Sequence, residues 1–362
     1  MKMIHTADLH LGSALAQLPK EKARRRGEEL LQTFARLAEY AKREGVYGVL
    51  IAGDLFDGEK TPRYWIRAVL SVVRAASPVR FFYVTGNHDE NPFDAGEALP
   101  ENLYRFDKAR GFYTYALPEN VTVSGIDYAA MGDRNVYQTL ALSPETFNIV
   151  MMHGNLVQSQ YPDKDAVCLP NLWNRGIDYL ALGHIHNPPQ SAALGTRGKY
   201  RYAGCLEGRG FDETGEKGAW LLEIRDKKLV VETFLRFAER TVYEITVDLS
   251  GVKDILEARD LALKTASVAR DKDVVKLRLK GRVGLEIRRD IPRLATLFEN
   301  SFFHCKIEDE TAAEWNLAAF EKDASLRGEF VRQLSASLLP EDIKSDALAF
   351  GLAALAGEDI EI

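Results

Sequence analysis

The sequence predicts an α/β protein that consists of a large first domain, a small α+β module and helices at the carboxyl end. In the first 240 residues, apolar runs of strand length alternate with amphipathic helical patterns, which is typical of α/β folds. Shorter strands and helices continue to residue 308, and helical patterns fill residues 309–362. With 46% hydrophobic residues among 362, the chain can bury one large core and a smaller one. We therefore expect boundaries near residues 240 and 308.

The first domain, residues 1–240, is expected to contain strands that are buried on both faces, because its apolar runs are nearly continuous and bounded by glycine. These runs occupy residues 3–4, 46–52, 81–85, 149–152 and 179–182. Charged amphipathic patterns predict helices at residues 20–43 and 64–76. Near the end of the domain, two apolar runs flank Asp226, Lys227 and Lys228, and this pattern predicts an antiparallel hairpin.

The α+β module, residues 241–308, is predicted to have strands at 242–249, 274–279 and 301–307 and helices at 252–264 and 289–299. Its middle strand alternates apolar residues with Lys276, Arg278 and Lys280, so one face is expected to present three cations to solvent. That face is either an ordinary solvated surface or a contact for nucleic acid. In residues 309–362, an apolar stripe stopped by Pro340 and a second pattern at 343–355 predict two helices.

Five short strings with metal-ligand side chains follow the predicted strands of the first domain. Histidine, aspartate and asparagine supply mixed nitrogen and oxygen ligands, which suit manganese, iron or zinc. The carboxyl ends of strands in an open α/β sheet meet at one crevice, so we expect these side chains to converge. His5 and His304 lie outside this set. The strings are ADLHLG with Asp8 and His10, GDLFD with Asp54, GNHDE with Asn87 and His88, HGN with His153, and GHIH with His184 and His186.

The number of ligands predicts a site for two divalent cations, with Asp54 as the bridge between them. The two-residue spacing within ADLH and within GHIH is expected to project both ligands to the same side of an extended segment. Such a site would lower the pKa of a bridging water and produce hydroxide for in-line attack on phosphorus. We assign one cation to Asp8, His10 and His186, and the other to Asn87, His153 and His184.

His88 is left over for proton transfer. Because it directly follows the predicted ligand Asn87, it would lie close enough to stabilise the transition state or to protonate the leaving oxygen. The next residue, Asp89, is expected to orient a neighbouring imidazole. Each string alone has a structural explanation, such as a buried core histidine for His153 or an ordinary turn for GDLFD. Found in this order at five strand ends, the strings favour a metal site.

The ordered strings resemble the signature of the calcineurin-like metallophosphoesterases. Within that family, MIHTADLHLG and the later GRGFDETGEKG are similar to the SbcD-type and YhaO-type DNA repair exonucleases. The resemblance implies a four-layer αββα sandwich, a capping domain at residues 241–308, and carboxyl-terminal helices at 309–362 that bind the coiled-coil base of an SMC-like ATPase. It also implies His88 as the catalytic histidine. Two manganese ions are implied on Asp8, His10, Asp54, Asn87, His153, His184 and His186.

The resulting hypothesis is a two-metal-dependent DNA exonuclease of the SbcD type that acts in DNA repair with an SMC-like ATPase, and a homodimer is expected by analogy. Two alternatives stay open: a DNA-binding and ATPase-docking subunit with weak hydrolysis, and a metallophosphodiesterase or nucleotidase for small substrates. Residues 306–362 hold thirteen acidic and five basic residues, which suits a protein partner better than DNA. Residues 1–6 lead directly into the first strand, and no run of about 18 uncharged apolar residues occurs, so we expect no membrane association and a cytoplasmic location.

Overall fold

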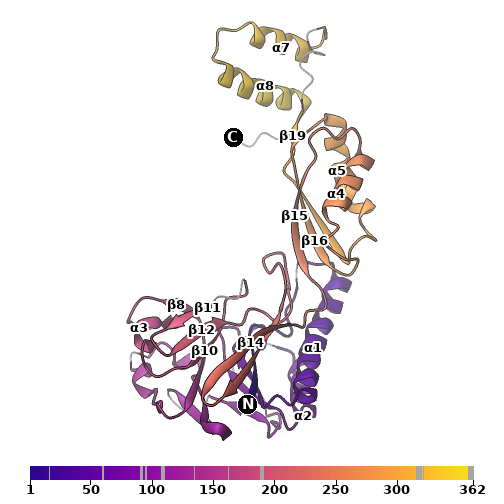
Figure 1. Cartoon of the computed structure of the whole chain (residues 1–362). Coiled ribbons are helices and arrows are strands. Elements are labelled where there is room, and N and C mark those ends of the chain that lie inside the picture. The colour runs from indigo at the N-terminus through magenta and orange to yellow at the C-terminus, as the bar shows by residue number, and fades with distance from the viewer. Residues whose placement is uncertain are drawn as a thin grey trace. The chain divides into compact units, whose positions relative to one another are not determined.

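The computed structural model describes residues 1–15, 17–58, 61–89, 93, 96–106, 111–133, 135–161, 163–187, 191–314, 320 and 322–357. The chain divides into two compact units, Met1–Val242 and Tyr243–Ile362, and Figure 1 labels some of their elements. Among the residues in these ranges, no helix combines the length and the apolar character needed to cross a membrane.

Two six-stranded mixed sheets form the framework of the first unit. The first sheet has the order β14 (Lys228–Arg236), β13 (Gly218–Arg225), β1 (Lys2–Thr6), β2 (Gly48–Ala52), β3 (Arg80–Val84) and β4 (Leu103–Arg105). The second has the order β11 (Ser191–Leu194), β12 (Gly198–Tyr202), β10 (Tyr179–Gly183), β7 (Phe147–His153), β6 (Val121–Gly125) and β5 (Tyr113–Leu117), and the short turn η1 (Pro118–Asn120) joins β5 to β6. Strands β1 to β4 run parallel, as do β6, β7, β10 and β12. The predicted hairpin is present as β13 and β14.

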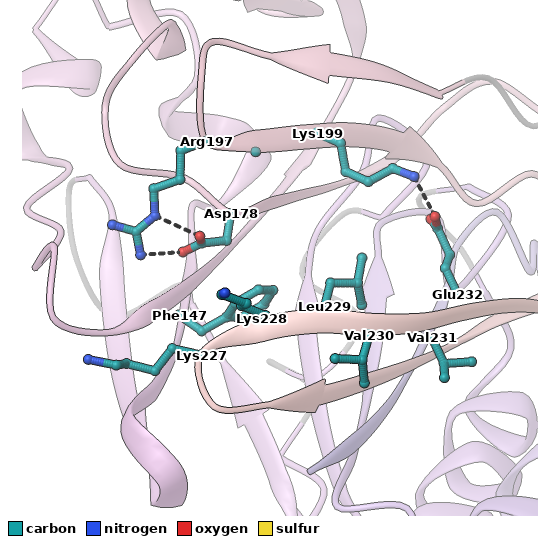
Figure 2. Close-up of a pocket in the computed structure, with 11 residues that line it drawn as sticks. Phe147, Asp178, Arg197, Lys199, Lys227, Lys228, Leu229, Val230, Val231 and Glu232 are labelled. Carbon is teal, nitrogen blue, oxygen red and sulfur yellow. Dashed lines mark hydrogen bonds and ion pairs between the residues drawn. The ribbon is translucent and has the colours of Figure 1, made fainter.

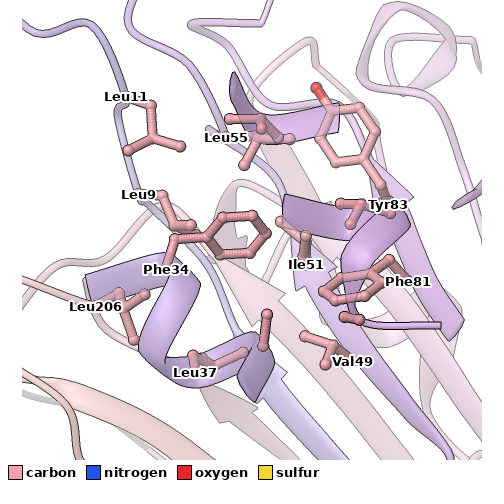
Figure 3. Packing of buried hydrophobic residues seen from close by; sticks show 14 of the residues in the cluster. Leu9, Leu11, Phe34, Leu37, Val49, Ile51, Leu55, Phe81, Tyr83 and Leu206 are labelled. Carbon is pink, nitrogen blue, oxygen red and sulfur yellow. The ribbon is translucent and has the colours of Figure 1, made fainter. Parts of the chain in front are cut away.

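The two sheets pack face to face because side chains alternate along their strands. On β2, Val49 and Ile51 belong to the cluster beneath the helices, and Leu50 belongs to the cluster between the sheets. The helices α1 (Lys20–Arg43) and α2 (Arg63–Ala75) cover the outer face of the first sheet, where Phe34 of α1 packs into the cluster shown in Figure 3. Both long helices predicted from the sequence are therefore confirmed.

The outer face of the second sheet is covered by short elements rather than by long helices. Their apolar side chains pack with Val150 and Met152 of β7 and with Leu180 and Leu182 of β10. The implied αββα sandwich is present, but its fourth layer consists of short helices and loops. The elements in this part of the chain are η2 (Tyr128–Ala130), η3 (Val136–Thr139), β8 (Asn155–Val157), β9 (Ala166–Cys168) and α3 (Leu169–Leu172).

The second unit contains a three-stranded sheet with helices packed on it. The strands lie in the order β15 (Val242–Asp248), β16 (Val274–Lys280) and β18 (His304–Asp309), the helices are α4 (Ile255–Thr265) and α5 (Leu285–Leu297), and β17 (Arg282–Val283) pairs with β19 (Ala312–Ala313). The helices α7 (Leu326–Ser335) and α8 (Glu341–Ala356) form a hairpin in which the ring of Phe330 lies against Gly351. The separation of this unit into a capping module and a helical segment stays a prediction.

His5 is expected to make the stability of the first unit depend on pH. It is fully buried on β1, and burial together with the charge of Arg201 lowers its pKa from 6.5 to about 3. Below pH 6.5 the unfolded chain therefore binds more protons at this residue than the folded chain does. We expect His5 to reduce the free energy of unfolding by roughly 1.4 kcal/mol for each pH unit below its ordinary pKa.

Urea unfolding of the wild type and of His5→Gln, measured at several pH values between 7.5 and 4, tests this expectation. Glutamine keeps a polar group beside the Tyr179 hydroxyl, which lies 3.0 Å from Nδ1 of His5. The variant should lose stability less steeply as the pH falls. Equal slopes for the two proteins would contradict the prediction.

Candidate metal centre

Side chains from five strands of both sheets meet at one edge of the first unit. The parallel strands β1, β2 and β3 deliver their carboxyl ends there, as do β7 and β10 of the second sheet. The convergence expected from the sequence is therefore observed. Close contacts join all seven predicted ligands: Asp8, His10, Asp54, Asn87, His153, His184 and His186.

A first group of donor atoms comes from Asp8, His10, Asp54 and His186, whose ligand atoms all lie within 4.8 Å of one another. The Nε2 atoms of His10 and His186 are 3.2 Å apart. Two imidazole nitrogens at this distance share at most one proton, whereas a cation between them would satisfy both lone pairs. The chemistry and the spacing of these donors fit a divalent metal ion.

A second group surrounds the side-chain oxygen of Asn87. This Oδ1 lies 2.9 Å from Nε2 of His153 and 3.1 Å from Nδ1 of His184. Asp54 lies between the two groups, because its Oδ2 is 3.4 Å from Nε2 of His10 and 3.4 Å from Nε2 of His153. Asp54 thus contacts members of both groups, and the binding of one cation by each group stays a prediction.

Left-handed backbone turns place these side chains. Asp8 and His10 have φ values of 52° and 44°, a conformation that costs a non-glycine residue roughly 1–3 kcal/mol. Asp54 and His184 also have positive φ. These segments are not extended, so the argument from two-residue spacing is wrong, and turns bring the ligands together instead. Gly86 permits the close approach, because a Cβ there would lie 2.2 Å from Oδ1 of Asp54.

Asp54 and His153 form a buried pair of opposite charge. Burial alone would raise the pKa of Asp54, but the hydrogen bond from His153 and the charges of His153 and His10 hold it well below its ordinary range. Burial alone would lower the pKa of His153, but the same contact with Asp54 raises it to about 9. Burial also raises the pKa of Asp8 to about 6. The opposite charges of Asp54 and His153 therefore stabilise each other.

His88 stands at the exposed edge of the centre. Its side chain is 46% exposed, and its backbone N–H donates to Oδ1 of Asp54 over 2.9 Å. Its Nδ1 lies 3.4 Å from Oδ1 of Asp57, a carboxylate that also accepts a hydrogen bond from Nδ1 of His10 over 3.0 Å. Asp57 is thus the carboxylate that the structure places beside the predicted catalytic histidine.

Asp89 does not have the role that the sequence suggested. Its carboxylate is buried and accepts hydrogen bonds from the backbone N–H groups of Leu55, Phe56 and Gly86. These bonds fix the loop after β2 against the loop after β3. The prediction that Asp89 orients an imidazole is therefore wrong, because its oxygens face backbone donors. Asp89 therefore stabilises the two loops that lead to the centre.

Three charged residues beside the centre were missed from the sequence. Asp57 stands in GDLFD, and Arg209 and Glu213 stand in GRGFDETGEKG, the two strings already noted for other reasons. Oε1 of Glu213 lies 2.8 Å from Nδ1 of His186, and Arg209 contacts Glu213 over 2.7 Å. Nothing in a linear string indicates which of several carboxylates will turn inward, so only the fold distinguishes them.

The predicted nucleic-acid face of β16 is a ladder of ion pairs. The three cations share one face, as expected, and each forms an ion pair there with a glutamate of the second unit. The glutamates offset much of the positive charge of Lys276, Arg278 and Lys280, and a contact with nucleic acid stays a prediction. The pairs are Lys276 with Glu308 (2.9 Å), Arg278 with Glu244 (3.2 Å) and with Glu310, and Lys280 with Glu310 (3.4 Å).

A pocket of about 600 Å³ lies at the other ends of the strands. Figure 2 shows it between the amino ends of β7, β10 and β12 and the turn of the β13–β14 hairpin. Arg197 and Lys199 line it, but each forms an ion pair, with Asp178 and Glu232 respectively. The residues that line this pocket include none of the seven converging side chains.

The sequence profile of the calcineurin-like phosphoesterases matches residues 1–188, the stretch that supplies both groups of donor atoms. This chain belongs to the calcineurin-like phosphoesterase family. Membership makes it a metal-dependent phosphoesterase, and the side chains of Asp8, His10, Asp54 and His186 form a group that could hold a metal ion.

Curated relatives of this phosphoesterase share about a quarter of its residues. The metallophosphoesterase YhaO of Bacillus subtilis is 27% identical over 309 residues, covering 78% of this chain and 72% of that protein. The DNA double-strand break repair protein Mre11 of Saccharolobus solfataricus is 22% identical over 327 residues, covering 86% and 83%. A subunit of the nuclease SbcCD from Staphylococcus epidermidis is 23% identical over 299 residues, covering 72% and 75%. Similarity to these proteins extends well beyond the 188 residues of the family profile.

Proposed function

We propose that this phosphoesterase is a DNA exonuclease that uses two manganese ions and acts in DNA repair in the cytoplasm. The observation that carries the proposal is the pair of donor groups that share Asp54 at the ends of five strands. Relatives that are named as part of a nuclease and as a DNA repair protein match both units of the chain, which supports DNA as the substrate.

We assign seven side chains to metal binding and one, that of His88, to proton transfer. Two divalent cations bound here would supply a nucleophilic water at neutral pH and neutralise charge on the phosphoryl oxygens. Manganese suits the mixture of imidazole, carboxylate and amide donors. His88 has an exposed ring next to these side chains and would donate a proton from that ring to the leaving oxygen. The proposed ligands are Asp8, His10 and His186 for one cation, Asn87, His153 and His184 for the other, and Asp54 for both.

The direct test is hydrolysis by the full-length protein of end-labelled linear duplex DNA, closed circular DNA and bis-p-nitrophenyl phosphate. We expect release of nucleotides from linear DNA with Mn²⁺, little cleavage of closed circles, and no reaction with EDTA. Turnover of the small ester without hydrolysis of DNA would refute the exonuclease and indicate a phosphodiesterase for small substrates. Binding of DNA without hydrolysis would refute it in favour of a docking subunit.

Replacing His88 with alanine should slow DNA hydrolysis about 10²- to 10⁴-fold, the usual range for the loss of a general acid. Its backbone contact with Asp54 remains in the variant, so the donor groups should still bind two Mn²⁺ ions. The rate of nucleotide release and the bound Mn²⁺ are measured on the same preparation. His304→Gln, which changes a histidine of β18 in the second unit, is the control and should keep the wild-type rate. A His88 variant as fast as this control would exclude the proposed role.

We also propose that the α7–α8 hairpin docks the coiled coil of an SMC-like ATPase. The apolar side chains of Leu326, Ile343 and Phe350 are 72%, 49% and 53% exposed, and residues 306–362 are acidic. An apolar surface of this kind on a helical hairpin suits a helical partner. Co-purification with a coiled-coil ATPase should be lost in Ile343→Asp/Phe350→Asp and kept in Val230→Asp, which changes an exposed residue of β14. Unchanged co-purification of the double variant would refute this docking site.

A further inference from the structure

Each of the two histidines of the first donor group has a carboxylate next to its Nδ1 atom. Nδ1 of His10 donates to Oδ1 of Asp57 over 3.0 Å, and Nδ1 of His186 lies 2.8 Å from Oε1 of Glu213. In both rings this contact places the proton on Nδ1 and leaves the lone pair of Nε2 directed at the other ring, 3.2 Å away. A carboxylate in this position also raises the electron density on the imidazole and makes it a stronger ligand.

Arg209 contacts both carboxylates, those of Asp57 and Glu213. Its Nη2 lies 2.7 Å from Oε1 of Glu213, and its Nη1 lies 3.6 Å from Oδ1 of Asp57. The backbone N–H of Arg209 also donates to Oε2 of Glu213 over 2.7 Å. The side chain of Glu213 is 1% exposed and that of Arg209 is 17% exposed, so the network is largely shielded from water. Two anions and one cation leave one negative charge on this side of the centre.

The histidines of the second donor group have neutral partners instead. Nδ1 of His153 donates to the backbone carbonyl of Ala52 over 2.9 Å. Nδ2 of the Asn155 amide lies 2.9 Å from Nε2 of His184. With a metal on Nδ1 of His184, Nε2 would carry the proton and the amide would present its oxygen to it. A carbonyl and an amide fix the orientation of a ring, but they add no net charge and polarise the imidazole less than a carboxylate does.

We propose that Asp57, Arg209 and Glu213 are positioning residues that make the two metal positions unequal. The position of His10 and His186 binds its cation with the higher affinity and fills first. The position of Asn87, His153 and His184 binds its cation more weakly and fills at higher metal concentration. This inference rests on the proposed metal-binding role of the two donor groups. It adds an order of filling and names the residues that set it.

The test is a titration of the metal-free, full-length protein with Mn²⁺, followed by calorimetry and by electron paramagnetic resonance. We expect two binding phases whose dissociation constants differ by at least about tenfold, since carboxylate partners behind ligands typically change metal affinity by 10- to 100-fold. At one equivalent of Mn²⁺ the spectrum should be that of an isolated ion. At two equivalents it should change to that of a coupled pair.

Substitutions test which residues set the affinity of each phase of metal binding. Glu213→Gln keeps the size of the side chain and removes its charge, so it should weaken the tighter phase by about 10- to 100-fold. Asn155→Ala is the matched control, because it removes a partner of His184 and should weaken only the second phase. Asp57→Asn acts on His10 and repeats the test independently if Glu213→Gln does not fold, which circular dichroism reports.

Binding of both ions in a single phase, or equal weakening of both phases by Glu213→Gln, would overturn the inference. In that case DNA hydrolysis that still requires Mn²⁺ would leave the proposed function intact. Absence of Mn²⁺ binding together with absence of hydrolysis would instead overturn both.

Discussion

Replacing Asp54 with asparagine is expected to reduce the rate of DNA hydrolysis by about 10⁴-fold, which corresponds to roughly 5.5 kcal/mol in the activation barrier. Asp54 is the side chain that faces both donor groups, with Oδ2 3.4 Å from a nitrogen of each. Asparagine has nearly the same shape and can still accept the hydrogen bond that the backbone of His88 donates to Oδ1. The variant therefore removes the bridging charge and leaves the surrounding loops in place.

The rate should be measured under single-turnover conditions with Mn²⁺ and linear DNA, alongside the stoichiometry of bound metal. Asp133→Asn is the matched control, because Asp133 is an exposed aspartate that bonds only locally to the backbone of Asn135 among the contacts found for it. This control should keep the wild-type rate. DNA cleavage by Asp54→Asn at a rate close to that of the control would rule out the shared carboxylate as the basis of activity.

Replacing Arg240 with alanine is expected to destabilise the first unit by about 1.5–3 kcal/mol, because it removes charge-assisted hydrogen bonds from a buried carboxylate that keeps Arg26 as a partner. Arg240 is 3% exposed and binds Glu29 of α1 through two nitrogens, over 2.6 and 2.8 Å. Arg26 binds Glu29 and also Glu207, over 2.8 and 3.0 Å. Burial alone would raise the pKa of Glu29, but the hydrogen bonds from Arg240 and Arg26 lower it to about 2, so the carboxylate stays charged.

Urea unfolding followed by tryptophan fluorescence measures this effect, because Trp65, Trp173 and Trp220 lie in the first unit. Arg24→Ala is the control. Its side chain is 84% exposed and pairs with Glu28 one turn away, so its loss should cost less than about 1 kcal/mol. Similar free energies of unfolding for the two variants would show that the buried cluster does not stabilise the unit as we infer.

The same cluster shows where a pattern of charges misleads. Arg24, Arg25 and Arg26 are adjacent in the sequence and resemble one solvated face at the start of α1. In the structure the side chain of Arg26 is 1% exposed, because a helix turns successive residues by 100° and directs this one toward Glu207. Its partner lies 181 residues further along the chain. A local pattern contains no information about that distance.

The charged residues of the second unit also have partners that the local sequence does not indicate. The alternation on β16 correctly predicted that Lys276, Arg278 and Lys280 share one face. Their glutamate partners come from β15 and from the region of β18, which pairs with β16 in parallel. Parallel pairing needs a long connection, so the neutralising residues stand about 30 positions away and were not associated with the cations when only the sequence was considered.

The sequence by itself indicated the long helices, the five strands that lead to the centre and the seven side chains that converge there. Apolar runs that end in glycine and a polar string are sufficient for this, because parallel strands must deliver their carboxyl ends to one edge of a sheet. Only the tertiary structure decided that Asp57 faces His88, that Asp89 holds backbone, and that Glu213 supports His186. The physical reason is that a side chain's partner depends on backbone turns and on strand packing, and these place residues together at separations that no local pattern records.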